Sequence, residues 1–240
     1  MRFDAANDHL MTGEFSAAAS ASEPYPRHRV ANVNVGLFDV RSYALCENTS
    51  ASTEYLYAPK AYGKFKLSNV VFSSQGSEPV SVALNLDLDG GFNLLDQTGN
   101  YALGKIIIDA TINGTSFPGE IHVCTMYCVE IQTGLLDGIM GRTYRNVRLM
   151  TPEVVVPVNQ PVTVEISMNL FIGVDSTPLA RGEGVFDSSF SFARTGPVFN
   201  VPTGITVNSE HSIIVDNVYY SGNTVPVRRS SWGAIKALFR

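Results

Sequence analysis

The chain has 240 residues, of which 45% are hydrophobic and only 16% are Asp, Glu, Lys or Arg. This length suffices for one large domain with a substantial core. The net charge of −5 gives no basic field for a phosphate backbone, which argues against a nucleic-acid partner. The longest apolar runs, such as IIIDA and MNLFIGV, are too short to span a membrane.

Residues 1–29 are rich in Ala and Ser, as in SAAASASEPYPRHR. Pro24 and Pro26 exclude a continuous helix there, so this segment is predicted to be an extended arm or a first strand. The residues after Met1, RFDAANDHLMTGEF, contain no apolar region of the kind found in signal peptides. Either the protein is intracellular, or the chain is a mature form whose leader is missing. We favour the second alternative because of the resemblance described below.

From Val30 onward, apolar and polar residues alternate with a period of two. The clearest case is VSVALNLDLD, and PVTVEISMNLFIG and YGKFKLS show the same pattern. Such alternation predicts half-buried strands with one solvated face, as in antiparallel sheets. Turns rich in Gly, Pro and Asn separate about ten such strands. We therefore predict an all-β fold over residues 30–227, an antiparallel β-sandwich of jelly-roll type.

One acidic turn is a candidate metal site. In NLDLDGGFNLLD, the carboxylates of Asp87, Asp89 and Asp96 lie around the tight Gly90-Gly91 turn. Loops of β-sandwiches bind Ca²⁺ through carboxylate and carbonyl oxygens, so the sequence suggests a Ca²⁺ site here, although the spacing is not that of an EF-hand. The alternative is that Asp87 and Asp89 form the solvated face of a strand that enters a hairpin.

The three cysteines, Cys46, Cys124 and Cys128, are too few for a disulfide-rich scaffold. If EIHVCTMYCVEI is a regular strand, Cys124 and Cys128 are about 13 Å apart, which is beyond disulfide reach. A bulge or turn at 125–126 would allow a local pair instead, and Cys46 could pair with either of the others. A cysteine in this chain can also be simply a small buried residue. The pairing stays open.

The sequence carries no recognisable catalytic motif. A nucleophile elbow, a Gly-rich phosphate loop and a paired-cysteine zinc pattern are all absent from it. Ser209, His211 and Asp216 are neighbours along one stretch of chain and would not converge as a triad. We therefore predict that the protein is not an enzyme. Aromatic residues in polar surroundings offer a route to sugar binding, or are ordinary strand residues; they are Tyr55, Tyr57, Tyr62, Tyr219 and Tyr220.

The last residues, VRRSSWGAIKALFR, differ from the rest of the chain. Four apolar residues fall at helical spacing and predict a short basic amphipathic helix within 228–240; they are Trp232, Ile235, Leu238 and Phe239. Because so short a helix is not stable alone in water, its apolar face needs a partner. The candidates are the chain's own sheets, a neighbouring subunit, a membrane surface or a sorting receptor.

The stretch GEGVFDSSFSFARTGPVFNVPTGITVNSEHSIIVDN resembles the closing segment of exported bacterial β-sandwich proteins, through its GPVF, PTGITVNS and IVDN motifs. That group is similar to the proteins with PEP-CTERM anchors, many of which also begin with Ala- and Ser-rich strands. The chain departs from them because it has no Pro-Glu-Pro motif, transmembrane segment or Arg cluster. It ends instead in WGAIKALFR, which is similar to endings of other secreted bacterial proteins. The resemblance covers about a third of the chain and implies an exported, non-catalytic surface or matrix protein.

We therefore expect a secreted structural protein of the bacterial surface or extracellular matrix, a homo-oligomer or filament subunit. The alternative is a carbohydrate-binding module, Ca²⁺-dependent if the acidic turn holds the metal. A third hypothesis is a jelly-roll viral coat protein. The net charge of −5 and the lack of a basic arm argue against it.

Overall fold

In the computed structural model, the described residues are 17–23, 27–35, 39–48, 60–94, 102–125, 130–174, 181–210 and 213–219. They form sixteen strands and no α-helix, and every strand pairing among them is antiparallel. The predicted all-β, antiparallel fold is therefore confirmed. The predicted C-terminal helix lies outside the described residues. In the described part of the chain, no helix is long and apolar enough to cross a bilayer.

The larger of the two main sheets has eight strands in the order β1-β2-β3-β12-β5-β10, and β9 and β13 also pair with β5. By register, β9 and β10 follow one another along one edge of β5, and β12 and β13 along the other. The strands of this sheet are β1 (Ala17–Glu23), β2 (Arg27–Val35), β3 (Asp39–Asn48), β5 (Val80–Leu94), β9 (Thr143–Met150), β10 (Val154–Val156), β12 (Arg181–Phe192) and β13 (Phe199–Asn200).

The second sheet has six strands in the order β14-β4-β11-β6-β7-β8. A separate two-stranded sheet pairs β15 with β16. These strands are β4 (Lys60–Ser73), β6 (Ala102–Ile112), β7 (Thr115–Cys124), β8 (Ile131–Gly134), β11 (Pro161–Val174), β14 (Thr206–Ser209), β15 (Ile214–Val215) and β16 (Val218–Tyr219).

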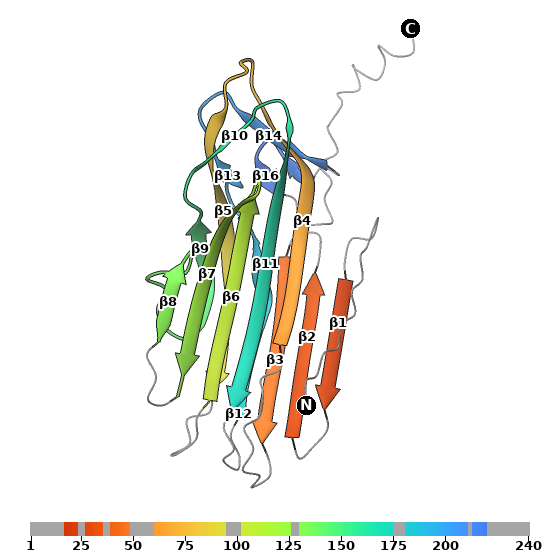
Figure 1. Ribbon diagram of the computed structural model, residues 1–240, viewed down its shortest axis with the longest axis vertical. Coiled ribbons are helices and arrows are strands. Elements are labelled where there is room, and N and C mark those ends of the chain that lie inside the picture. The colour runs from red at the N-terminus through yellow and green to blue at the C-terminus, as the bar shows by residue number, and fades with distance from the viewer. Residues whose placement is uncertain are drawn as a thin grey trace.

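The two main sheets lie one in front of the other and share one hydrophobic core (Figure 1). Aromatic rings join them: Phe65 of β4 lies edge-on to Phe192 of β12, with ring centroids 6.0 Å apart. Phe72 of β4 contacts Phe199 of β13 in the same way at 5.0 Å. Along β11 every second residue from Val162 to Val174 is buried, as the alternation of PVTVEISMNLFIG predicts.

A tight turn between β6 and β7 follows directly from its residues. Asn113 and Gly114 have φ angles of 49° and 83°, a left-handed conformation that Asn and Gly adopt at low cost. An Asn-Gly pair with positive φ at both positions is the preferred two-residue connection of a hairpin, because its twist matches that of the strands. The predicted turn in INGTSFPG is therefore observed.

The prediction for β5 is wrong in one respect. Its core face is as expected, but the opposite face, predicted to be solvated, is also buried: Ala83, Asn85 and Asp87 are 2%, 7% and 8% exposed. Side chains and backbone from β9 and from residues 194–200 lie against this face and bind its polar groups. The contacts that join these covering segments to β5 link residues 57 to 115 positions apart in sequence, so the local alternation pattern carries no sign of them.

Candidate functional site

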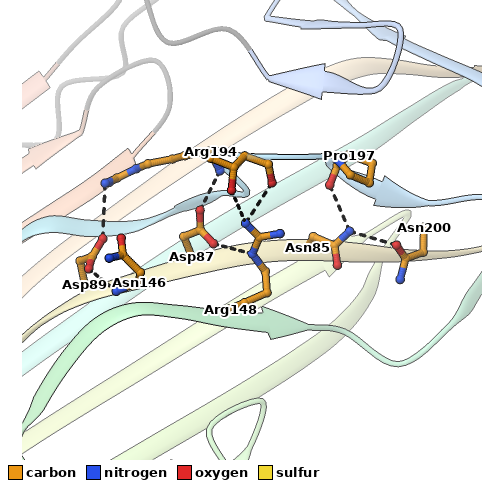
Figure 2. Close-up of polar contacts among 9 residues, drawn as sticks. Asn85, Asp87, Asp89, Asn146, Arg148, Arg194, Pro197 and Asn200 are labelled. Atoms are coloured by element: carbon orange, nitrogen blue, oxygen red, sulfur yellow. Dashed lines mark hydrogen bonds and ion pairs between the residues drawn. The ribbon is translucent and has the colours of Figure 1, made fainter.

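A row of polar side chains along β5 binds the segments that cover it (Figure 2). At its centre, Asp87 Oδ1 accepts a hydrogen bond from Arg148 Nε of β9 at 2.6 Å, and Asp87 Oδ2 accepts one from the backbone N–H of Arg194 at 2.7 Å. Arg148 Nη2 donates further to Thr195 O at 3.0 Å. The Asp87–Arg148 ion pair therefore holds β9 against β5. The bonds from Arg194 N to Asp87 and from Arg148 to Thr195 hold the chain after β12 at the same place.

Two neighbours extend this row in both directions (Figure 2). Asp89 Oδ1 accepts from the backbone N–H of Asn146 at 2.6 Å, and Asp89 Oδ2 lies 3.4 Å from Arg194 Nη1. On the other side, Asn85 Nδ2 donates to the Pro197 carbonyl at 3.1 Å and to Asn200 Oδ1 at 3.2 Å. Each of these contacts joins distant parts of the chain, which indicates a structural role for the row.

The predicted Gly90-Gly91 turn is wrong, because both glycines continue β5 and pair with Tyr144 and Thr143 of β9. The acidic segment therefore lies along a strand and differs from a pre-formed cation site in the part that is described. All four carboxylate oxygens of Asp87 and Asp89 face hydrogen-bond donors or a guanidinium group. Asp96 lies outside the described residues, and within the described ranges no group of three or more His, Cys, Asp or Glu residues could hold a metal. Ca²⁺ binding by residues Asp87, Asp89 and Asp96 stays a prediction.

The motifs that carry the resemblance to exported proteins connect strands through side-chain hydrogen bonds. We name their residues Asn208, Ser209 and Asn217 the brace. Asn217 of IVDN has a φ of 63°, and its side chain binds the backbone of Phe199: Oδ1 accepts from Phe199 N at 2.8 Å and Nδ2 donates to Phe199 O at 2.7 Å. In PTGITVNS, Asn208 Oδ1 accepts from Asp216 N at 3.0 Å and Ser209 Oγ accepts from Ile214 N at 2.8 Å. These side chains connect β13, β14 and the β15–β16 pair.

The structure describes two of the three cysteines. Cys46 is buried on β3, and Cys124 is the last residue of β7 and forms a disulfide bond. The disulfide bond of Cys124 therefore lies at the end of β7, and its partner stays open. Cys128 itself lies outside the described residues.

The outer face of the six-stranded sheet has two distinct halves. In one half, charged groups contact one another: Lys64 and Lys66 of β4 both form salt bridges with Glu165 of β11, the latter at 3.2 Å. Asp109 of β6 accepts from Ser116 Oγ at 2.7 Å. Burial alone would raise the pKa of the Glu165 carboxyl, but the hydrogen bonds from Lys64 and Lys66 outweigh it and hold this pKa below its ordinary value.

The other half, which we name the Tyr62 face, combines aromatic rings with polar groups from four adjacent strands. Its residues are Tyr62, Asn169, Phe171, Lys105, Glu120 and His122. The register places Tyr62 beside Asn169 and Phe171 beside Lys105, which in turn lies beside His122. Tyr62 is 56% exposed. Lys105 Nζ lies 2.8 Å from Glu120 Oε1, and Lys60 Nζ lies 4.7 Å from the centre of the Phe171 ring.

Two atoms of the Tyr62 face are buried without a hydrogen-bond partner in the described structure, namely Asn169 Oδ1 and His122 Nε2. Buried polar atoms are nearly always paired, so two exceptions on one face of the sheet, on β11 and on β7 with β6 between them, are notable. Burial lowers the pKa of His122, and Lys105 adds to this effect while Glu120 opposes it. The imidazole is therefore neutral at pH 7 and has one nitrogen that can accept a hydrogen bond.

We expect acid to destabilise the fold through His122. Because its pKa is lower in the folded than in the unfolded chain, the unfolded state binds more protons once the pH falls below about 6.5, and the free energy of unfolding decreases from there downward. The depressed pKa of Glu165 acts in the same direction at lower pH. Thermal unfolding between about pH 7 and pH 5 should show a weaker pH dependence in His122→Gln than in the wild-type chain. Equal slopes for the two proteins would contradict this prediction.

Two of the five tyrosines in polar surroundings are described, and they differ. Tyr62 is exposed, whereas Tyr219 is only 7% exposed and packs edge-on against Phe192 as an ordinary strand residue, with ring centroids 5.9 Å apart. Tyr55, Tyr57 and Tyr220 lie outside the described residues. The sequence reading missed Asn169 and Phe171, although both occupy polar-face positions of the alternating PVTVEISMNLFIG stretch, which was a usable signal.

A second surface feature is the set of sheet edges, where backbone groups are open to strand addition. Three edge strands are short: β8 has four residues, β10 three and β14 four. β9 carries Arg145 and Arg148 and pairs with β5 across a register shift. The part of β4 that does not pair with β14 carries three lysines, and the N–H of Ser68 in this part donates to Glu210 Oε1 at 3.0 Å. Short length, bulges and charges are the usual protections of an edge.

β1 has none of these protections. Its seven residues, AAASASE, pair with β2 in unbroken register from Ala17 to Glu23, and the strand contains no Lys, Arg or Pro. Among the described strands, only β2 pairs with β1. Figure 1 shows the β1–β2 hairpin beside β4 rather than behind the six-stranded sheet.

Comparison with known proteins gives no relative. No family model, no curated protein and no solved structure matches the chain. The functional reading therefore rests on the geometry described above.

Proposed function

We propose that this chain is a secreted, non-catalytic structural protein of a bacterial surface or extracellular matrix, whose subunits assemble into polymers by strand addition at β1. The observation that carries the proposal is the edge of β1, which has an unbroken register and no Lys, Arg or Pro and which, among the described strands, pairs with β2 only. The described edge strands β8, β10 and β14 are short instead. A seven-residue regular edge offers a row of backbone donors and acceptors to an incoming strand.

The chemistry of β1 supports an edge that is meant to be paired. Ala and Ser give low steric hindrance to a neighbouring strand, and the only charged residue, Glu23, stands at the end of the strand. Proteins that avoid edge-to-edge pairing place lysines or prolines at such positions, and this chain does so on β4 but not on β1.

Two further features support export. Cys124 forms a disulfide bond, and structural disulfides persist mainly in oxidising compartments such as the periplasm and the extracellular space. The low content of charged residues also fits extracellular β proteins. Neither feature by itself identifies a compartment, and together with the sequence resemblance they favour secretion.

We also infer that the fold is a jelly-roll sandwich. If β3, β4, β5, β6, β7, β9, β11 and β12 are counted along the chain, one sheet reads first-eighth-third-sixth and the other second-seventh-fourth-fifth. Two successive Greek keys produce this order. β1 and β2 are then additions that widen one sheet and create the open edge.

Assembly should fail when the β1 edge is charged. The double variant Ser20→Lys/Ser22→Lys places two lysines on the edge strand, the charges that natural edge strands use against the addition of another strand. We expect the wild-type chain to form polymers, detected by light scattering and negative-stain microscopy, and the variant to remain monomeric with an unchanged circular dichroism spectrum.

The matched control is Gln75→Lys/Ser77→Lys, which adds the same two charges in the exposed turn between β4 and β5. This control should assemble like the wild-type chain. A wild-type chain that stays monomeric at high concentration, or equal assembly of both variants, would refute the proposal. Truncation after Val227 in the same assay separates the edge from the tail, because polymers that persist without residues 228–240 assign assembly to β1.

A further inference from the structure

Exposed apolar side chains gather on the outer face of the eight-stranded sheet, beside the first half of β5. Met150 of β9 and Val155 of β10 are 56% and 64% exposed. In the register they lie opposite Asn85 and Ser81 of β5, and residues opposite one another in a sheet project from the same face. Both side chains therefore point away from the core, on the side where the polar row of β5 lies.

A chain of contacts links these side chains to the last described strand. Asn200 Nδ2 lies 2.8 Å from Met150 Sδ. Asn85 Nδ2 binds both Asn200 Oδ1 and the carbonyl of Pro197 (Figure 2). Pro197 is exposed and forms a β-bridge with Val218, which is 42% exposed. We name these four exposed apolar residues the Met150 patch: Met150, Val155, Pro197 and Val218.

Acidic side chains flank the Met150 patch. Glu153 lies two residues before Val155, Asp216 lies two residues before Val218, and both acidic residues are exposed. Glu153 Oε2 accepts a hydrogen bond from Ser81 Oγ at 2.7 Å. Among the ion pairs of the described residues, none includes either carboxylate. An occupant that fits this patch combines apolar side chains with positive charge.

The end of the chain has this composition. Its apolar face of Trp, Ile, Leu and Phe is accompanied by four cations, namely Arg228, Arg229, Lys236 and Arg240. A helix of this length needs an apolar partner in water. Tyr219, the last described residue, directly follows Val218 of the patch. Residues 220–227 join it to Arg228 and can span up to about 30 Å, so the tail can reach every part of the patch.

We propose that residues 228–240 dock as an amphipathic helix on the Met150 patch of their own chain, with the apolar face on the patch and the cations toward Glu153 and Asp216. A tethered segment has an effective concentration in the millimolar range, which favours the chain's own tail over that of a neighbour. The site is independent of the assembly edge, because β1 lies at the opposite end of the eight-stranded sheet from β9 and β10.

Trp232 is the only tryptophan of the chain, so its fluorescence reports on the tail alone. The experiment measures quenching of this fluorescence by acrylamide in the full chain. A docked indole is shielded from solvent, so the quenching constant should be about threefold lower than in the urea-unfolded chain. The value should not change on dilution, because the contact lies within one chain.

The double variant Met150→Lys/Val155→Lys places two cations where the apolar, basic tail would lie. Quenching of Trp232 should rise about threefold, to the value of the unfolded chain, while the β-sheet circular dichroism stays unchanged. The matched control is Ile131→Lys/Met140→Lys, at two other exposed apolar positions, on β8 and in the turn that follows it. This control should keep the quenching of the wild-type chain. If the first variant does not fold, Ile235→Ser/Leu238→Ser removes the contact from the side of the tail and should have the same effect.

Four results would overturn the proposal. They are quenching in the wild-type chain equal to that of the unfolded chain, protection that disappears on dilution, protection that appears only with phosphatidylglycerol vesicles, and protection that survives the lysines at Met150 and Val155. Dilution would assign the tail to a neighbouring subunit, and vesicles would assign it to a membrane. The Ser20→Lys/Ser22→Lys variant should protect Trp232 like the wild-type chain, so this proposal and the assembly proposal fail separately.

Discussion

The substitution Asn217→Ala should lower the free energy of unfolding by about 3 kcal/mol, because two backbone groups of Phe199 lose their partners at once. Asn217 Oδ1 accepts from Phe199 N at 2.8 Å, and Asn217 Nδ2 donates to Phe199 O at 2.7 Å. One edge of β13 pairs with β5, where Phe199 lies opposite Leu84. On the other edge of β13, the Asn217 side chain binds the backbone groups that a further strand would otherwise pair with.

The cost is large because Phe199 is almost fully buried, with an exposed fraction of 1%, and its ring packs on Phe72. A loosened Phe199 backbone would disturb this contact between the two sheets. Chemical denaturation followed by tyrosine fluorescence or circular dichroism measures the change in unfolding free energy.

Two companion variants separate the causes. Asn217→Gly relieves the positive φ of 63° but also lacks the side chain, so it should recover only about 1 kcal/mol relative to Asn217→Ala. Asp216→Gly, at the exposed neighbouring position with a φ of 50°, should change stability by less than about 0.5 kcal/mol. If Asn217→Ala were as mild as Asp216→Gly, the brace would not stabilise the fold.

A second large effect is expected from Asp87→Ala, which should also cost about 3 kcal/mol. Its carboxylate is buried on the outer side of β5 and holds both Arg148 Nε at 2.6 Å and Arg194 N at 2.7 Å. Removing it leaves a guanidinium group and a backbone N–H without their acceptor. We expect a loss at the lower end of the range for broken buried ion pairs, because the Arg148 side chain is 40% exposed and regains some hydration.

Asp87→Asn tests which part of the interaction matters. The amide keeps one acceptor oxygen and loses the charge, so we expect an intermediate cost of about 1–2 kcal/mol. Asp109→Ala, which removes a more exposed carboxylate on the other sheet, is the control and should cost about 1 kcal/mol. A smaller loss for Asp87→Ala than for Asp109→Ala would contradict a structural role of the row.

The same variant bears on the predicted Ca²⁺ site. If Asp87 and Asp89 bind Ca²⁺, the ion must compete with Arg148 and with the backbone N–H groups that already donate to these carboxylates. A Ca²⁺-dependent rise in melting temperature that Asp87→Ala abolishes would show such competition. The absence of any Ca²⁺ effect would remove the prediction.

Local patterns were a good guide where a strand has one covered face. The alternations in β4 and β11, and the Asn113–Gly114 turn, depend on neighbours in sequence and were predicted correctly. The pattern in β5 has the same period, yet its polar face is buried. Alternation predicts which side of a strand is apolar. It does not predict whether another segment of the chain covers the polar side.

The candidate sites show the same limit. Tyr62 was recognisable as a polar-face aromatic residue, but its neighbours Lys105, Asn169 and His122 come from three other strands. Only the strand register brings them together. The IVDN and TVNS motifs could be recognised as a resemblance, whereas their role as a brace became evident only from the hydrogen bonds of Asn208, Ser209 and Asn217.

The sequence by itself determined the all-β class, the antiparallel pairing and the position of most core residues, because strand periodicity and turn chemistry are local properties of the chain. The tertiary structure decided which faces are covered, which edges are open and which polar groups meet, because these depend on pairings between residues that lie about a hundred positions apart. The buried Asp87, the Tyr62 face and the position of β1 at the end of its sheet among the described strands are all consequences of strand order. Strand order results from the whole chain packing around one core, and no single stretch of sequence encodes it.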